Sequence, residues 1–97
     1  MDPLDEYFRP ELVRKAQEQN PFLKLNDVVY GIIENGITHG TLPPGTRLGV
    51  VRIASLLEVS RTPVSEALEQ LKSEGLVVTP PGRKGHYVFD ISHTSLE

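Results

Sequence analysis

The sequence predicts a small, mostly α-helical domain that ends in a β-hairpin. Two segments with helical apolar periodicity, residues 50–57 and 60–75, are separated only by Glu58 and Val59, so the two helices must cross sharply at this link. Residues 76–79 and 86–89 have strand character and flank a turn rich in Pro and Gly, which is typical of a hairpin. Together these observations predict a winged helix-turn-helix.

Length and composition limit the possible functions. The 97 residues leave room for one small core, and the absence of Cys excludes disulfides and Cys-based zinc sites. With 10 Lys and Arg against 13 Asp and Glu, the net charge is −3, so any nucleic-acid binding must come from a local basic surface. The apolar runs are too short for a membrane span, and the acidic start is not a signal peptide. We therefore expect a cytoplasmic protein with no membrane partner.

Residues 1–25 are predicted to form a partly helical N-terminal extension. Pro10 suits the first turn of a short helix that ends near residue 20. Its weak apolar face consists of Phe8, Leu12, Val13 and Ala16. Two interpretations are open: the extension docks or dimerises, or it is a frayed arm, because so few apolar residues do not fix a helix unaided. Phe22 and Leu23 favour docking.

The apolar rhythm of residues 26–39 predicts the first helix of the core. Gly31 and Gly36 lie within it, and each lowers helix stability by about 1 kcal/mol relative to Ala. Either a neighbouring segment packs closely there or the helix is bent, and we favour close packing. The paired prolines of residues 40–45 stop the helix, and residues 46–48 are predicted to form a short strand.

The helix predicted from Ser60 to Gly75 buries one stripe formed by Val64, Ala67, Leu68 and Leu71. Ser60 or Thr62 can cap its start, and Gly75 supplies the left-handed residue at its end. Arg61, Thr62 and Ser65 remain on the outward side. A helix that presents Arg, Thr and Ser from its N-terminus is suited to enter the major groove of DNA, although an ordinary amphipathic surface helix is the alternative.

The predicted hairpin has a basic tip. Its turn, residues 80–85, contains Arg83 and Lys84, which are placed to contact phosphates or a narrow minor groove whose negative potential attracts cations. Gly85 permits the turn, and His86 begins the returning strand.

Several short motifs follow one another along residues 25–89. They are Gly40-Thr41-Leu42-Pro43-Pro44-Gly45-Thr46-Arg47-Leu48, Ile53-Ala54, Val59-Ser60-Arg61-Thr62-Pro63-Val64, Glu66-Ala67-Leu68, and Leu71 with Glu74-Gly75-Leu76-Val77. In this order and spacing, residues 25–89 resemble the N-terminal DNA-binding domain of the GntR family of bacterial transcription regulators, the FadR-like branch in particular.

The resemblance implies that the helix beginning at Arg61 reads the major groove, that the wing lies at the minor groove, and that dimers bind near-palindromic operators. It also implies that Arg61 contacts a base, most often a guanine edge, and that Thr62 contacts a phosphate or a base. Three positions depart from the family pattern: Ser65 stands where Arg is common, Glu58 where Gly is usual, and Val50 where an acidic residue is common. The missing cation at Ser65 implies a different affinity or operator.

The predicted DNA contacts combine the helix, the wing and one residue of the preceding helix: Arg52, Arg61, Thr62, Ser65, Arg83, Lys84, Gly85 and His86. For Arg47, contact and no contact are equally open. No metal or cofactor is expected, because His39, His86 and His93 are scattered without a carboxylate at ligand spacing. The sequence has no nucleophile elbow and no phosphate-binding Gly-rich loop, so we predict that the chain is not an enzyme.

The predicted function is sequence-specific DNA binding by the domain of a GntR-type transcription regulator, with repression as the expected action. Residues 90–97 are predicted to be a linker or tail toward an effector domain. The chain is therefore interpreted as truncated, or as a regulator that dimerises through residues 1–25. The alternative is a winged helix that binds protein, which the net negative charge, the acidic Glu66 and Glu69, and the uncharged Ser65 favour.

Overall fold

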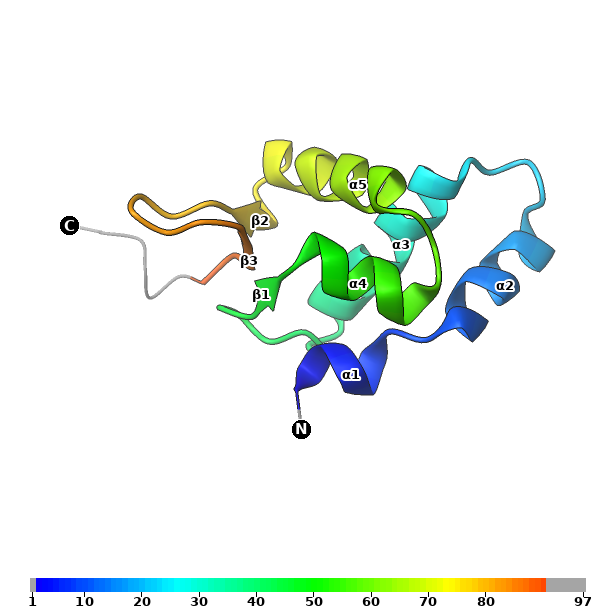
Figure 1. Cartoon of the computed structure of the whole chain (residues 1–97), viewed down its shortest axis with the longest axis horizontal. Coiled ribbons are helices and arrows are strands. Elements are labelled where there is room, and N and C mark those ends of the chain that lie inside the picture. The colour runs from blue at the N-terminus through cyan, green and yellow to red at the C-terminus, as the bar shows by residue number, and fades with distance from the viewer. Residues whose placement is uncertain (1, 91–97) are drawn as a thin grey trace.

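The structure is a computed structural model that describes residues 2–90. Along these residues the elements are α1 (Pro3–Tyr7), α2 (Pro10–Gln19), α3 (Leu25–Thr38), β1 (Arg47–Leu48), α4 (Val50–Leu57), α5 (Arg61–Ser73), β2 (Val77–Val78) and β3 (His86–Val88). Figure 1 shows the helices gathered in one body, from which the β2–β3 hairpin projects as a wing. The mostly α-helical winged helix-turn-helix predicted from the sequence is confirmed.

The predicted tail lies outside the described residues except for Asp90, and His93 lies outside them as well. Within residues 2–90, every helix is too short or too polar to cross a lipid bilayer.

Helix α1 is absent from the sequence prediction, and tertiary contacts explain why it forms. The Asp2 carboxylate caps the helix by accepting a hydrogen bond from the Leu4 N–H at 3.0 Å. Leu4 and Phe8 expose only 4% and 2% of their surfaces. The Tyr7 hydroxyl donates a hydrogen bond to the Ile32 carbonyl at 2.5 Å. The structure therefore docks α1 onto the core, in place of the frayed arm that was the alternative.

Helix α2 begins at Pro10, as predicted, because the missing N–H of proline falls in the first turn, where amides have no partner within the helix. Val13 is buried and holds the helix against the core. The loop after α2 differs from the prediction. Phe22 and Leu23 expose 94% and 40% of their surfaces, so these two side chains do not dock.

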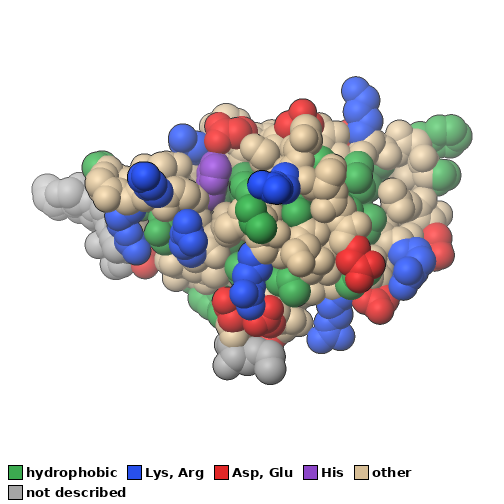
Figure 2. Space-filling model, in the orientation of Figure 1, with side chains coloured by type: hydrophobic (Ala, Val, Ile, Leu, Met, Phe, Trp, Pro, Cys, Tyr) green, Lys and Arg blue, Asp and Glu red, His purple; other side chains and the backbone are tan. Residues whose placement is uncertain are grey.

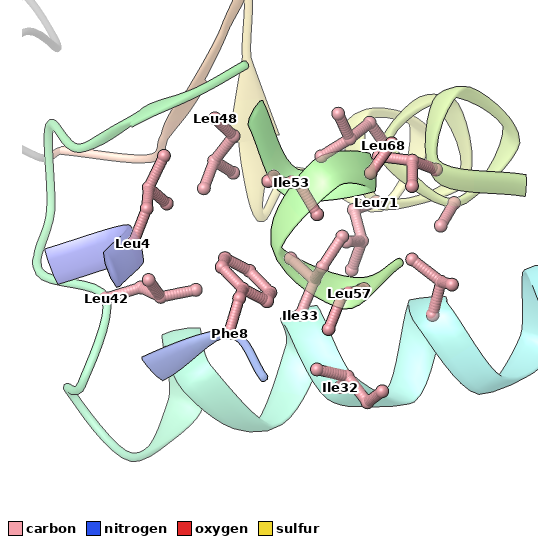
Figure 3. Packing of buried hydrophobic residues seen from close by; sticks show 14 of the residues in the cluster. Leu4, Phe8, Ile32, Ile33, Leu42, Leu48, Ile53, Leu57, Leu68 and Leu71 are labelled. Atoms are coloured by element: carbon pink, nitrogen blue, oxygen red, sulfur yellow. The ribbon is translucent and has the colours of Figure 1, made fainter. Parts of the chain in front are cut away.

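The core is formed by side chains from every helix. Helix α3 packs most extensively against α5 and also contacts α2. In Figure 3, Phe8 lies beside Ile33 of α3 and Leu57 of α4, with Ile53 and Leu71 completing the same interior. Within the described part of the chain, all buried side chains are apolar. The N-terminal helices and the helix-turn-helix thus share one hydrophobic core.

The two glycines of α3 differ in their surroundings. A Cβ added at Gly36 would lie 2.6 Å from Leu42 Cδ1 and 2.8 Å from Tyr7 Cε2, whereas a Cβ at Gly31 would meet no atom within 4 Å. The predicted close packing is confirmed at Gly36 and is wrong at Gly31.

Helices α4 and α5 end in the same way, with a left-handed residue after the last turn. At the end of α5, Gly75 has φ 85°, its N–H bonds the Lys72 carbonyl, and the Leu76 N–H bonds the Leu71 carbonyl. This is the Schellman arrangement. Helix α4 repeats it, with Glu58 at φ 59° in the position of the glycine. The left-handed turn redirects the chain between α4 and α5 and so produces their sharp crossing.

The strands form one antiparallel sheet in the order β1-β3-β2. The predicted hairpin is present, with Val77 opposite Val88 and Val78 opposite Tyr87. The predicted strand at residues 46–48 is also present. It pairs with β3 on the side away from β2, where Leu48 lies opposite His86. This pairing fixes the base of the wing to the segment that precedes α4.

Candidate nucleic-acid interface

The start of α5 presents polar side chains above a buried layer. Arg61, Thr62 and Ser65 are exposed, whereas Pro63 and Val64 between them are buried. Ser60 is the N-cap residue by its extended backbone, but its side chain makes no capping hydrogen bond in the structure. The first turn of α5 is therefore held in place by apolar packing, and its outward side carries a guanidinium and hydroxyl groups.

The wing carries a second group of cations. Lys84 is exposed at the tip, and the guanidinium of Arg83 lies 4.5 Å from the ring centroid of Tyr87, a cation–π contact that fixes its direction. In Figure 2, Lys and Arg side chains gather over the wing, although the net charge of the chain is −3. The basic surface is therefore local, as the composition requires.

Arg47 belongs to the same basic surface, which the sequence left open. Its Nε atom lies 3.2 Å from the point where a Cβ on Gly85 would stand, and Gly85 itself has φ 96°. Gly85 thus serves the wing in two ways: it adopts a backbone conformation that side chains disfavour, and it leaves room for the guanidinium of Arg47. The sequence predicts the strand at residues 46–48 that carries Arg47. It does not predict that this strand pairs with β3, which brings Arg47 to the wing.

His86 lies at the base of the wing and faces α5. Its Nε2 atom is 2.8 Å from Glu69 Oε2, and its side chain is only 17% exposed. This hydrogen bond holds the pKa of the Glu69 carboxyl below its usual value. Alternation along β3 explains the direction, since His86 and the buried Val88 share one face of the strand. The predicted DNA contact by His86 therefore competes with an internal partner on α5.

Arg52 differs from the other predicted contacts on α5 and the wing because it forms ion pairs with two carboxylates. Its Nη2 atom lies 2.5 Å from Asp5 Oδ2 and 3.9 Å from Asp2 Oδ2, both supplied by α1 and its cap. The sequence offers no sign of this pairing, because the residues are 47 positions apart.

The arrangement has the chemistry of a nucleic-acid interface. Arg, Thr and Ser side chains can hydrogen-bond base edges and phosphates, and cations on a projecting hairpin can lie against a phosphate backbone. Within residues 2–90, no three His, Asp or Glu side chains are grouped so that they could hold a metal ion. Of the eight predicted contacts, the structure places Arg61, Thr62 and Ser65 together on α5 and Arg83, Lys84 and Gly85 together on the wing.

Comparison with known proteins covers most of the described chain. Residues 25–88 match the family described as "Bacterial regulatory proteins, gntR family". The HTH-type transcriptional repressor RspR of Escherichia coli is 38% identical over 73 residues, which cover 75% of this chain and 32% of that protein. An uncharacterized HTH-type transcriptional regulator of Agrobacterium vitis is 38% identical over 68 residues, which cover 70% of this chain and 39% of the relative.

Solved structures show the same similarity. The crystal structure of a GntR family transcriptional regulator from Pseudomonas syringae pv. tomato is 38% identical, with a TM-score of 0.63 over 68% of this chain and 27% of that chain. A second crystal structure, of a GntR-family transcriptional regulator, is 40% identical with a TM-score of 0.60. The chain spans about a third of the length of the curated relatives it matches.

Proposed function

Because the chain belongs to the GntR family of bacterial regulatory proteins, we propose that it recognises an operator sequence with α5 in the major groove and the wing at the minor groove. The chain carries the DNA-binding domain of this family of transcription regulators, which is not an enzyme family. The observation that carries the proposal is the exposed Arg61 and Thr62 at the first turn of α5, above the buried Pro63 and Val64.

In this proposal α5 supplies the sequence readout. Arg61 donates two hydrogen bonds to guanine O6 and N7, which discriminate between bases by about 1–3 kcal/mol. Thr62 and Ser65 donate hydroxyl hydrogen bonds to a phosphate or a base edge. Because Ser65 carries no charge, readout depends more strongly on Arg61.

The wing supplies affinity in this proposal. Arg83 and Lys84 contact phosphates or enter the minor groove, and Arg47 adds a third cation beside Gly85. Each phosphate that a cation neutralises makes the log–log slope of affinity against salt steeper by about 0.9. We therefore expect weak binding by a single domain, with a marked salt dependence.

The wider biological role is proposed by family likeness. We propose a cytoplasmic repressor, as the name of RspR suggests for that relative, which acts as a homodimer on a near-palindromic operator. Dimerisation through a C-terminal domain is one route, and the surface of residues 1–25, where Phe22 is exposed, is the other. Membership of the FadR-like branch is supported by the motif resemblance. The family membership argues against the protein-binding alternative, and Glu69, which favoured that alternative, is engaged by His86.

The test is selection of bound duplexes from a random DNA library at low salt, in parallel for the wild type, Arg61→Ala and Arg14→Ala. Arg14 is an exposed arginine on α2 that pairs with Glu11, so its loss matches the charge change far from α5. We expect the wild type and Arg14→Ala to enrich one two-fold-related motif that Arg61→Ala loses. If Arg61→Ala enriches the same motif, α5 does not read bases through Arg61, and the proposed readout is wrong.

A further inference from the structure

Helix α1 places two carboxylates against Arg52, a cation at the edge of the proposed DNA surface. We propose that Asp5 and Asp2 compete with DNA phosphates for Arg52, so that α1 limits the affinity of this domain for DNA. The inference rests on the proposed function, because it concerns the surface over which the phosphate backbone would run.

The geometry of the ion pair supports competition. One guanidinium nitrogen of Arg52 lies 2.5 Å from Asp5 and 3.9 Å from Asp2. The side chains of Arg52, Asp5 and Asp2 are 48%, 34% and 43% exposed, so water, salt and a phosphate all reach the pair. In Figure 2, acidic and basic side chains adjoin beside the N-terminus.

The carboxylates are held in place by the fold. Leu4 and Phe8 are buried at either end of α1, and the Tyr7 hydroxyl is bonded to the Ile32 carbonyl. Asp2 is fixed a second time, because its other oxygen caps the Leu4 N–H. A carboxylate that cannot diffuse away acts at a high effective concentration, so it competes well with an external anion.

The position of Arg52 is one that DNA is expected to approach. Arg52 lies on α4, and the helix before a recognition helix crosses the phosphate backbone in helix-turn-helix complexes. Arg52 also shares an open depression with Arg47, whose guanidinium lies over Gly85 of the wing. The carboxylates of Asp5 and Asp2 balance the guanidiniums of Arg52 and Arg47 at this corner, whereas α5 and the wing present cations. Phosphates are therefore attracted less at α4 than at the wing.

The experiment compares binding of the whole chain to a short mixed-sequence duplex over a range of salt concentrations. The test variant is Asp2→Asn/Asp5→Asn, because asparagine caps a helix as well as aspartate does. The charge-matched control is Glu6→Gln/Glu18→Gln, which removes two exposed carboxylates elsewhere on α1 and α2. Both pairs of changes are also made in an Arg52→Gln background, and far-UV circular dichroism verifies that every variant is folded.

We expect the Asp2→Asn/Asp5→Asn variant to gain one phosphate contact. The log–log salt slope then becomes steeper by about 0.9, and affinity rises by roughly five- to tenfold near 0.1 M salt. The control changes the slope by much less, and with Arg52→Gln the test variant behaves like the control.

Other results overturn the inference. If the test variant binds more weakly than the wild type, the carboxylates position Arg52 for contact and do not compete with DNA. If the gain persists with Arg52→Gln, it comes from the general field of the molecule. If the wild type binds the duplex and no variant changes the salt slope, only this inference is wrong. If neither the wild type nor any variant binds the duplex, the proposed function is wrong as well.

Discussion

Helix α3 contains two glycines whose replacement by alanine we expect to change the free energy of unfolding in opposite directions. At Gly36 the new methyl group would lie 2.6 Å and 2.9 Å from two carbons of Leu42 and 2.8 Å from the ring of Tyr7. Carbon atoms in good contact are about 3.5–4.0 Å apart, so these neighbours must move. At Gly31 no atom lies within 4 Å of the new methyl group.

Neither neighbour of Gly36 is free to move. Leu42 is fully buried, and its N–H donates to the Gly36 carbonyl at 2.8 Å. Tyr7 is tied through its hydroxyl to the Ile32 carbonyl. Overpacking of this kind costs up to about 3 kcal/mol, against a helix-propensity gain of about 1 kcal/mol, which leaves a net loss of up to about 2 kcal/mol for Gly36→Ala. Gly31→Ala retains only the gain, up to about 1 kcal/mol.

Urea unfolding and thermal unfolding, both followed by circular dichroism, measure the two effects. We expect the melting temperature to rise by about 4–8 °C for Gly31→Ala and to fall by a similar or larger amount for Gly36→Ala. Adding Leu42→Val to Gly36→Ala should cost less than the two changes separately, because the smaller side chain relieves the clash. The reasoning is refuted if Gly36→Ala is as stable as the wild type with an unchanged dependence on urea.

Two further predictions concern the helix ends and one titration. Residues 58 and 75 both have positive φ, which glycine adopts more easily than other residues. In the same urea assay, Glu58→Gly should therefore stabilise the fold by about 0.5–1 kcal/mol, and Gly75→Ala should destabilise it by about 1 kcal/mol. If both changes stabilise the fold, or both destabilise it, the prediction is wrong. The hydrogen bond from the Tyr30 hydroxyl to Glu74 raises the pKa of Tyr30 to about 12, so the folded state favours the neutral phenol. The stability that this preference adds is present below the ordinary pKa of 10.0 and is lost as pH rises through the folded-state value. Ultraviolet titration should show a tyrosine ionising near pH 12 that is absent in Tyr30→Phe and that moves toward the ordinary value of 10.0 in Glu74→Gln. An unchanged titration in Glu74→Gln would rule out the carboxylate as the cause.

The central helices could be predicted because their local signals agree. The apolar spacing in α4 and α5, the two-residue link and the left-handed Gly75 all indicate one arrangement. Helix α1 escapes prediction for a physical reason. Its five residues hold a helix only because Leu4 and the following Phe8 are buried by distant parts of the chain.

The candidate site shows the same division. Arg61 and Thr62 follow from the position of α5, and their exposure agrees with the prediction. The orientation of His86 toward Glu69 also agrees with strand alternation, because His86 lies two residues before the buried Val88 and therefore on the same face of β3. The partner of Arg52 cannot be predicted in this way, because it depends on where an unpredicted helix docks.

Because Leu4, Phe8 and Val13 are buried, the family domain and the hydrophobic core of this chain have different N-terminal boundaries. The part of the chain that matches the family begins at residue 25, but the hydrophobic core begins at residue 4. Similarity to the family defines the first boundary, and burial of apolar side chains defines the second. A cut at residue 25 would expose the apolar surfaces of α3 and α4 that the N-terminal helices cover. In this chain the segment that matches the DNA-binding family is therefore shorter than the segment that shares the hydrophobic core.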